Sequence, residues 1–166
     1  MSTSLVSLAS LVNAFNPVTP QLRVAAIVVR GTQILLVEHR RRGEHYWVLP
    51  GGRLEGLETL EAALRRELRE ELSLDARVGE LVIVSEMLAP DRHVVNLMFH
   101  AEIGEGAEPR LDRADPVLAG WQWVSTDQLP RLDFRPPIAD PLRAVIAENF
   151  AGRVRLLGDT WRPLPR

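Results

Sequence analysis

Three glutamates lie close together near the middle of the chain, at positions 67, 70 and 71. On an α-helix, the i, i+3, i+4 spacing places Glu67, Glu70 and Glu71 within a wedge of roughly 100° on adjacent turns. Crowded like charges weaken a helix unless a cation or basic side chains compensate for them. Carboxylate oxygens suit Mg²⁺ or Mn²⁺. The spacing is therefore compatible with a divalent-metal site, but taken alone it favours the simpler interpretation of a solvated face on which the interleaved arginines pair with the acids.

A turn-forming sequence precedes these glutamates. Apolar residues 47–49 are followed by Pro50, Gly51 and Gly52, which predicts a short strand that enters a tight glycine turn. Glycine allows the backbone to approach a ligand closely and to direct a carbonyl at a metal. Thr59 then has the residue type of a helix N-cap. The apolar stripe that would seat the helix on a sheet consists of Leu60, Ala63, Leu64 and Leu68.

The stretch from Gly52 to Leu74 resembles the Nudix box, whose pattern is G, five residues, E, seven residues, then R-E-U-x-E-E-x-G-U with U apolar. The matching positions are Gly52, Glu58, Arg66, Glu67, Leu68, Glu70, Glu71 and Leu74. Ser73 stands where the pattern has glycine, and Leu57 replaces a glycine that many members carry. Ser73 would affect the turn that ends the helix without touching a carboxylate. On these positions the chain is identified as a member of the MutT-like Nudix hydrolases.

The resemblance implies an enzyme that hydrolyses phosphoric anhydride bonds with Mg²⁺, for which Mn²⁺ can substitute. The implied metal ligands are Glu67, Glu70, Glu71 and the Gly52 carbonyl. The metal would neutralise phosphate charge and lower the pKa of a bound water. Glu67 is either a further ligand or the general base, and Arg66 would orient a carboxylate by a charge-assisted hydrogen bond. The implied catalytic residues are therefore Glu67, Glu71 and Arg66.

A general base outside the box stays an open alternative. The candidate acids are Glu86, Glu102, Asp112 and Asp115. Asp115 lies in the loop before Trp121, where some relatives that resemble this chain place a functional acid. Each of the four is also explained as an ordinary surface or strand-edge carboxylate.

The choice of substrate is weakly encoded. Pro90 lies sixteen residues past Leu74, an offset that resembles the ADP-ribose pyrophosphatase subgroup, although prolines are common in loops. The basic candidates for contact with phosphate or ribose are Arg40, Arg42 and Arg92, which solvation alone would also explain. We expect a nucleoside diphosphate linked to another moiety, ADP-ribose or a similar nucleotide sugar first. The alternatives are a (d)NTP, including oxidised nucleotides, and a non-catalytic nucleotide-binding regulatory module.

Composition narrows the class of protein. A chain of 166 residues with 46% hydrophobic content can bury a sizeable core, and its net charge of −2 gives no footprint for nucleic acid or a membrane surface. The absence of cysteine excludes a disulfide scaffold and a thiolate metal site, and is compatible with the cytoplasmic location that we expect. No apolar run approaches membrane-spanning length, and the first residues lack the basic region of a signal peptide.

The order of the elements predicts an α/β fold. Residues 1–20 are expected to form a short helix or arm, and residues 21–166 a single domain. The predicted strands are 23–29, 33–39, 47–49, 77–87, 93–103 and 121–124, with the first two joined as a hairpin. A second helix is expected over residues 140–149. Two helices on opposite faces of mixed strands give an α/β/α sandwich with a mixed central sheet. The resemblance also admits a homodimer, through the N-terminal arm or residues 156–161.

Overall fold

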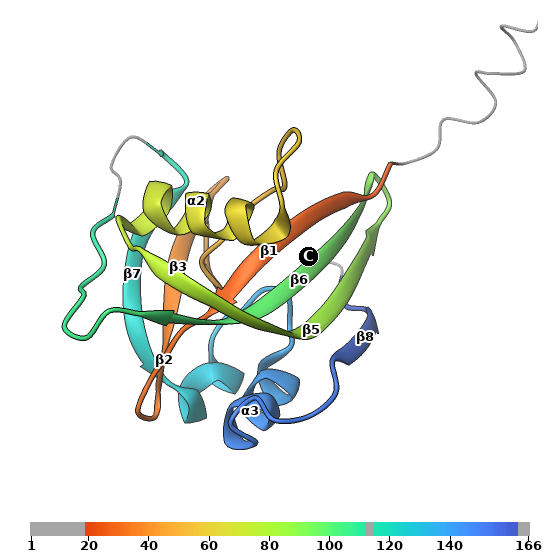
Figure 1. Ribbon diagram of the computed structural model, residues 1–166. Coiled ribbons are helices and arrows are strands. Elements are labelled where there is room, and N and C mark those ends of the chain that lie inside the picture. Colours follow the sequence, from red (N-terminus) through yellow and green to blue (C-terminus); the bar gives the residue numbers. More distant parts are fainter. Residues whose placement is uncertain (1–18, 112–114, 163–166) are drawn as a thin grey trace, which may run out of the picture.

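The computed structural model describes residues 19–111 and 115–162. Two four-stranded sheets lie at its centre (Figure 1). The first has the order β1 (Gln21–Ile27), β6 (Arg92–Ile103), β5 (Ala76–Ala89), β8 (Arg155–Asp159). In this sheet β1 runs parallel to β6 and β8 parallel to β5, while β5 and β6 are antiparallel, so the sheet is mixed. The second is antiparallel and contains β2 (Val29–Arg30), β3 (Gln33–Arg41), β4 (Glu44–Val48) and β7 (Leu118–Ser125).

Helices lie on both sides of the sheets. Figure 1 shows α2 (Leu60–Leu72) above them and α3 (Ala139–Ala147) below, next to the 3₁₀ helix η1 (Thr126–Arg131). Each helix covers its own apolar cluster, because residues of opposite parity on the central strands face opposite sides. The predicted α/β fold with a mixed sheet between two helices is confirmed, and the strands divide into two sheets.

Most predicted elements have a counterpart in the structure. The first predicted strand divides into β1 and β2, and the hairpin joins β2 to β3 through the pair Arg30 and Gln33. The long strands β5 and β6 extend a few residues beyond their predicted ends, and α3 ends two residues earlier than predicted. Strand β8 was not predicted. It pairs with β5 in parallel over a short alternating segment.

Helix α2 has the predicted start and a strained end. The Thr59 hydroxyl accepts a hydrogen bond from the Ala62 N–H at 3.2 Å, which caps the first turn. The helix buries Ala63, Leu64, Leu68 and Leu72, and burial of each leucine contributes about 2 kcal/mol. Ser73 ends the helix in the left-handed region with φ of 54° and ψ of 33°. An L-residue with a Cβ is disfavoured there, which is why the family pattern has glycine at this position.

Two further expectations concern the N-terminal residues and membrane-spanning segments. The arm predicted for residues 1–20 falls outside the described residues except at positions 19 and 20. Within the described residues, no helix has both the length and the apolar content needed to span a membrane.

Replacing Ser73 with glycine is expected to stabilise the protein by about 1 kcal/mol, because glycine occupies the left-handed region without a Cβ penalty. Chemical denaturation of Ser73→Gly measures this directly. Ser73→Ala is the matched control, since alanine keeps the Cβ and gains nothing. Equal stability of the glycine and alanine variants would contradict the assignment of strain to this position.

Candidate active site

The glycine turn is held against the free side of β1. Val24 N–H donates to the Gly52 carbonyl at 2.9 Å, and Ala26 N–H donates to the Pro50 carbonyl at 2.9 Å. Gly51 has φ of +137°, and a Cβ there would lie 2.2 Å from the Val24 carbonyl oxygen. Only glycine fits this approach of two backbones.

The turn meets two of the three glutamates of α2. Gly51 N–H donates to the Glu71 carboxylate at 2.9 Å. A Cβ on Gly52 would lie 2.2 Å from the Glu67 carboxyl carbon. The Glu67 carboxylate therefore occupies space that any other residue at position 52 would fill. Both carboxylates are brought to the same turn by a helix that is seated on the sheet through its apolar stripe.

Arg66 connects the remaining acids. Its guanidinium donates to both oxygens of Glu58, at 3.2 Å from Nε and 2.8 Å from Nη2. Nη1 donates to Glu67 at 3.0 Å and to Glu70 at 3.1 Å. Nη2 also donates to the Arg53 carbonyl at 3.0 Å. All five N–H donors of Arg66 are therefore used within the protein.

Burial controls the protonation of the two inner glutamates. It raises the pKa of Glu71 to about 7, against the lowering effect of the Gly51 hydrogen bond. Burial also raises the pKa of Glu67, although the hydrogen bond from Arg66 opposes it. By contrast, the hydrogen bonds from Arg66 hold the pKa of the half-buried Glu58 below its usual range. Glu67 is thus partly compensated by Arg66, whereas Glu71 has no hydrogen-bonded cation in the described part of the chain, as expected for a carboxylate that binds a metal ion.

Of the candidate bases outside the box, Asp115 is the one whose charge acts on Glu71. The pKa of Glu71 is raised mainly by burial and also by the Asp115 charge. Asp115 itself accepts a hydrogen bond from Val117 N–H at 2.8 Å. Glu86 instead pairs with His93 at 2.9 Å, and Glu102 pairs with an arginine on the neighbouring strand. Asp112 lies outside the described residues.

His39 lies in the same region. Burial, followed by the charge of Arg23, lowers its pKa to about 4, so the imidazole is neutral near pH 7. Its Nε2 is buried and has no hydrogen-bond partner within the described residues. The ring meets Tyr46 edge-on, with 5.5 Å between ring centroids.

The predicted substrate contacts lie at exposed positions. Arg40 and Arg42 belong to the β3–β4 hairpin, where Arg42 has φ of 54° in the turn. Pro90 and Arg92 lie at the β5–β6 hairpin, which continues past the start of β1. In the described part of the chain, no hydrogen bond or ion pair joins any of the three arginines to the glutamates of α2. Their role in substrate binding stays a prediction.

The residues present fit a divalent cation, although they are not assembled around one. Within residues 19–111 and 115–162, no three acidic or histidine side chains converge on a common ion position. Arg66 holds Glu67 and Glu70, while Gly51 N–H holds Glu71. The donors are nevertheless all oxygens, Glu71 is poorly compensated, and position 52 has no side chain that would block the Glu67 carboxylate. To bind a metal, Glu67 and Glu70 would exchange their contacts with Arg66, and Glu71 its contact with the Gly51 N–H, for the ion.

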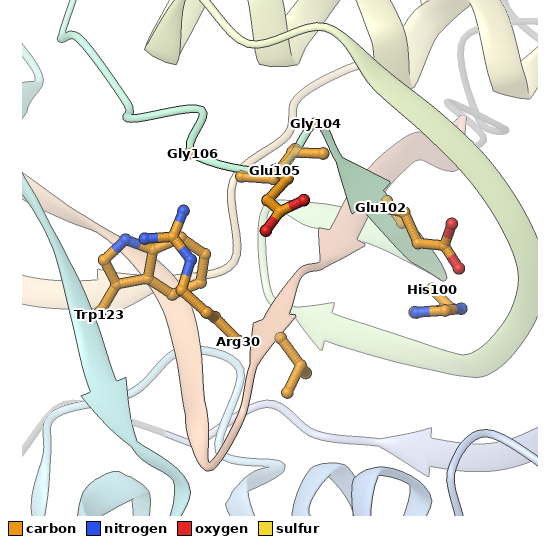
Figure 2. Close-up of a pocket in the computed structure, with 10 residues that line it drawn as sticks. Arg30, His100, Glu102, Gly104, Glu105, Gly106 and Trp123 are labelled. Atoms are coloured by element: carbon orange, nitrogen blue, oxygen red, sulfur yellow. The ribbon is translucent and has the colours of Figure 1, made fainter.

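A hollow of about 580 Å³ lies elsewhere on the sheets, between β2, the end of β6 and β7 (Figure 2). The Arg30 guanidinium covers the Trp123 ring at 4.3 Å from its centroid. Arg30 also donates to Glu108 and to the Ala107 carbonyl, both at 2.8 Å. The box glutamates are not among the residues that line this hollow, so it is a separate feature.

Sequence reasoning missed Arg23 as a site residue. Arg23 lies on β1, donates from Nη2 to the Gly51 carbonyl at 3.1 Å, and influences the pKa of both inner glutamates, which is set mainly by burial. The available signal was a basic residue directly before the apolar run 24–29, which is equally typical of the first residue of a strand.

Comparison with known proteins agrees with this geometry. The NUDIX domain family model matches residues 19–145. The NAD-capped RNA hydrolase NudC of Erwinia tasmaniensis is 33% identical over 134 residues, which cover 80% of this chain and 48% of that protein. The phosphatase NudJ of Escherichia coli K12 is 29% identical over 111 residues, covering 66% of this chain and 71% of that protein. This chain spans about half the length of the NudC proteins that it matches.

A solved structure has the same fold at low identity. It is an ADP-ribose pyrophosphatase from Streptococcus suis, with a TM-score of 0.64 and 20% identity, covering 85% of this chain and all of the other. The fold and the site define a protein of the MutT type. The chain belongs to the Nudix family, because the family model matches more than half of its residues.

Gly52→Ala is expected to disrupt the site while leaving the fold intact. The new Cβ displaces the end of a flexible side chain, the Glu67 carboxylate, so we expect a change of less than about 1 kcal/mol in the free energy of unfolding and a loss of about 100-fold in Mg²⁺-dependent activity. Activity assays and thermal denaturation measure the two effects. The control is Gly104→Ala, where a Cβ meets no atom within 4 Å. Equal activity of the two variants would contradict the packing of Glu67 against Gly52.

Without metal, Glu71 is expected to destabilise the folded state as the pH rises. Its folded pKa of about 7 lies above the usual 4.5, so the folded state binds more protons and stability falls between about pH 4.5 and 7. Glu71→Gln removes this titration. We expect the variant to be more stable than the wild type at pH 8 by about 3 kcal/mol, with the difference vanishing near pH 4.5. Urea unfolding in a chelator at both pH values tests this, and a pH-independent difference would contradict the burial effect.

Proposed function

We propose that this protein is a Mg²⁺-dependent hydrolase that cleaves the diphosphate linkage of a nucleoside diphosphate joined to a second moiety. The observation that carries the proposal is the meeting of Glu67 and Glu71 at the glycine turn, next to the Arg66 network. Family membership supports the same reaction class.

Each residue has a distinct role in this proposal. Glu67, Glu70, Glu71 and the Gly52 carbonyl would hold the metal, and the carbonyl retains a second lone pair beside its bond from Val24. When bound, the metal neutralises phosphate charge and lowers the pKa of a water molecule. Glu67 is either one of these ligands or the proton acceptor, and burial raises its pKa, which favours acceptance of a proton. Asp115 is the alternative base outside the box.

Arg66 acts as a positioning residue. Its bidentate contact with Glu58 fixes the guanidinium plane, and from that plane it directs Glu67 and Glu70. If those glutamates bound a metal instead, the contact with Glu58 would still hold Arg66 and keep its charge near them.

We propose ADP-ribose or a similar nucleotide sugar as the first substrate to test. The position of Pro90 supports this choice, and a structure of the same fold is named an ADP-ribose pyrophosphatase. The name of NudC, an NAD-capped RNA hydrolase, points to a dinucleotide that also contains a diphosphate linkage. ADP-ribose, nucleotide sugars and NAD all join a nucleoside diphosphate to a second group. The runner-up is a (d)NTP, including oxidised nucleotides.

The proposal extends to cellular context. A small-molecule nucleotide is the proposed partner, and a homodimer is the assembly to examine. We propose a cytoplasmic location, with which the cysteine-free sequence is compatible.

Purified protein with Mg²⁺ is expected to release AMP from ADP-ribose. Glu71→Gln is expected to reduce this activity by about 1000-fold, because it removes a metal-binding charge. A panel of ADP-ribose, NAD, other nucleotide sugars, dinucleoside polyphosphates and (d)NTPs, with product analysis, identifies the preferred substrate.

Glu61→Gln provides the matched control, since Glu61 lies on the same helix and is exposed, and its one ion pair among the described residues is with Arg65 at 3.8 Å. It should retain wild-type activity. If nucleotides bind but no member of the panel is cleaved, the non-catalytic regulatory module replaces the enzyme as the account of function.

A further inference from the structure

The two arginines beside the glutamates differ in what they have left to offer a ligand. Arg66 uses all five of its N–H donors inside the protein. Substrate can therefore gain little from Arg66 without breaking the network that orients the carboxylates. A phosphate group needs another cationic partner in the site.

Arg23 has donors to spare. It is half-buried on β1, and its one side-chain hydrogen bond in the described part of the chain runs from Nη2 to the Gly51 carbonyl. Among the described residues, no carboxylate lies within 4.0 Å of the Arg23 guanidinium. The arginine that forms ion pairs with the acids of the site is Arg66. A half-buried guanidinium whose one side-chain hydrogen bond goes to a carbonyl leaves N–H donors available to an anion that arrives with the ligand.

Gly51 places Arg23 next to the carboxylates. The N–H of Gly51 binds Glu71, and its carbonyl binds Arg23, so the two side chains flank one glycine. Burial is the main influence on the pKa of Glu71 and of His39, and the charge of Arg23 acts on both in the lowering direction. The guanidinium is thus close to the site without neutralising it.

The position of Arg23 on β1 indicates where a ligand bound to it would extend. Arg23 lies opposite Asn96 in the parallel pairing of β1 with β6. Along β6, Arg92 precedes Asn96 by four positions, which corresponds to about 13 Å at the rise of a strand. Arg23 therefore lies between the box glutamates and the β5–β6 hairpin that carries Pro90. The exposed Arg40 and Arg42 lie on the other sheet.

We propose that Arg23 binds a non-bridging oxygen of the substrate's diphosphate, on the β1 side of the metal-binding glutamates. The inference rests on the proposed function for the identity of the anion. The planar guanidinium, steadied by the Gly51 carbonyl, presents a donor fork that matches a phosphate group. Arg23 then supplies the anion contact that Arg66 cannot, and the other end of the substrate extends toward the β5–β6 hairpin.

The test measures binding of methylenediphosphonate, a diphosphate that cannot be hydrolysed, by calorimetry in Mg²⁺. Arg23→Gln is expected to weaken this binding at least tenfold. It should leave the affinity for Mg²⁺ alone unchanged or tighter, because a nearby positive charge is lost. Arg53→Gln is the matched control, since Arg53 is exposed, forms a backbone bridge with Arg23 and donates from its side chain to Gln21. It should change diphosphonate affinity less than twofold.

Equal losses in Arg23→Gln and Arg53→Gln, or a weakened affinity for Mg²⁺ alone in Arg23→Gln, would overturn the proposal. If Arg23→Gln does not fold, Arg23→Lys takes its place. Lysine keeps the charge but loses the fork, so binding should fall at least threefold, and wild-type affinity would overturn the proposal.

The outcomes also separate this inference from the proposed function. Diphosphonate binding that depends on Arg23, in a protein that cleaves no nucleotide, would leave the inference standing and remove the hydrolase. Nucleotide cleavage that Arg23→Gln leaves unchanged would support the hydrolase and overturn the inference about Arg23.

Discussion

The structure of the site depends on the contact between Arg66 and the acids around it. Glu67, Glu70 and Glu71 repel one another on adjacent turns of α2, and a short helix with this charge pattern is weak by itself. The Arg66 guanidinium offsets part of that repulsion at Glu67 and Glu70, and Glu58 anchors the guanidinium from the preceding loop. Arg66 forms no hydrogen bond with Glu71 among the described residues, so the buried Glu71 charge is poorly compensated and would be stabilised by a bound cation.

The glycine turn provides the second constraint. Gly51 and Gly52 lie so close to β1 and to α2 that side chains at either position would collide with Val24 or Glu67. Because of this closeness, Gly51 binds Glu71 through its N–H and Arg23 through its carbonyl. Gly52, which has no side chain, leaves room for the Glu67 carboxylate. The backbones of the turn and of β1, together with the Glu67 carboxylate, therefore define the space at this turn.

Much of this was predictable from the sequence, and the failures have physical reasons. The start of α2 at Thr59, its apolar stripe and the long strands follow from local periodicity. Strand β8 does not, because its pairing with β5 is long-range and its five residues alternate only weakly in burial. Arg23 resembled an ordinary residue at a strand end, since its importance comes from Gly51, twenty-eight positions away in the chain. Ser73 was recognised as a departure from the pattern, but only the backbone shows the left-handed conformation that glycine would relieve.

The most direct test of the account is diffraction from crystals soaked in Mn²⁺, with anomalous scattering used to locate the ion. We predict a peak bounded by the carboxylates of Glu67, Glu70 and Glu71 and the carbonyl of Gly52, with Arg66 still bound to Glu58. The account would be contradicted by an empty cluster in which Arg66 continues to bind Glu67 and Glu70 at saturating Mn²⁺.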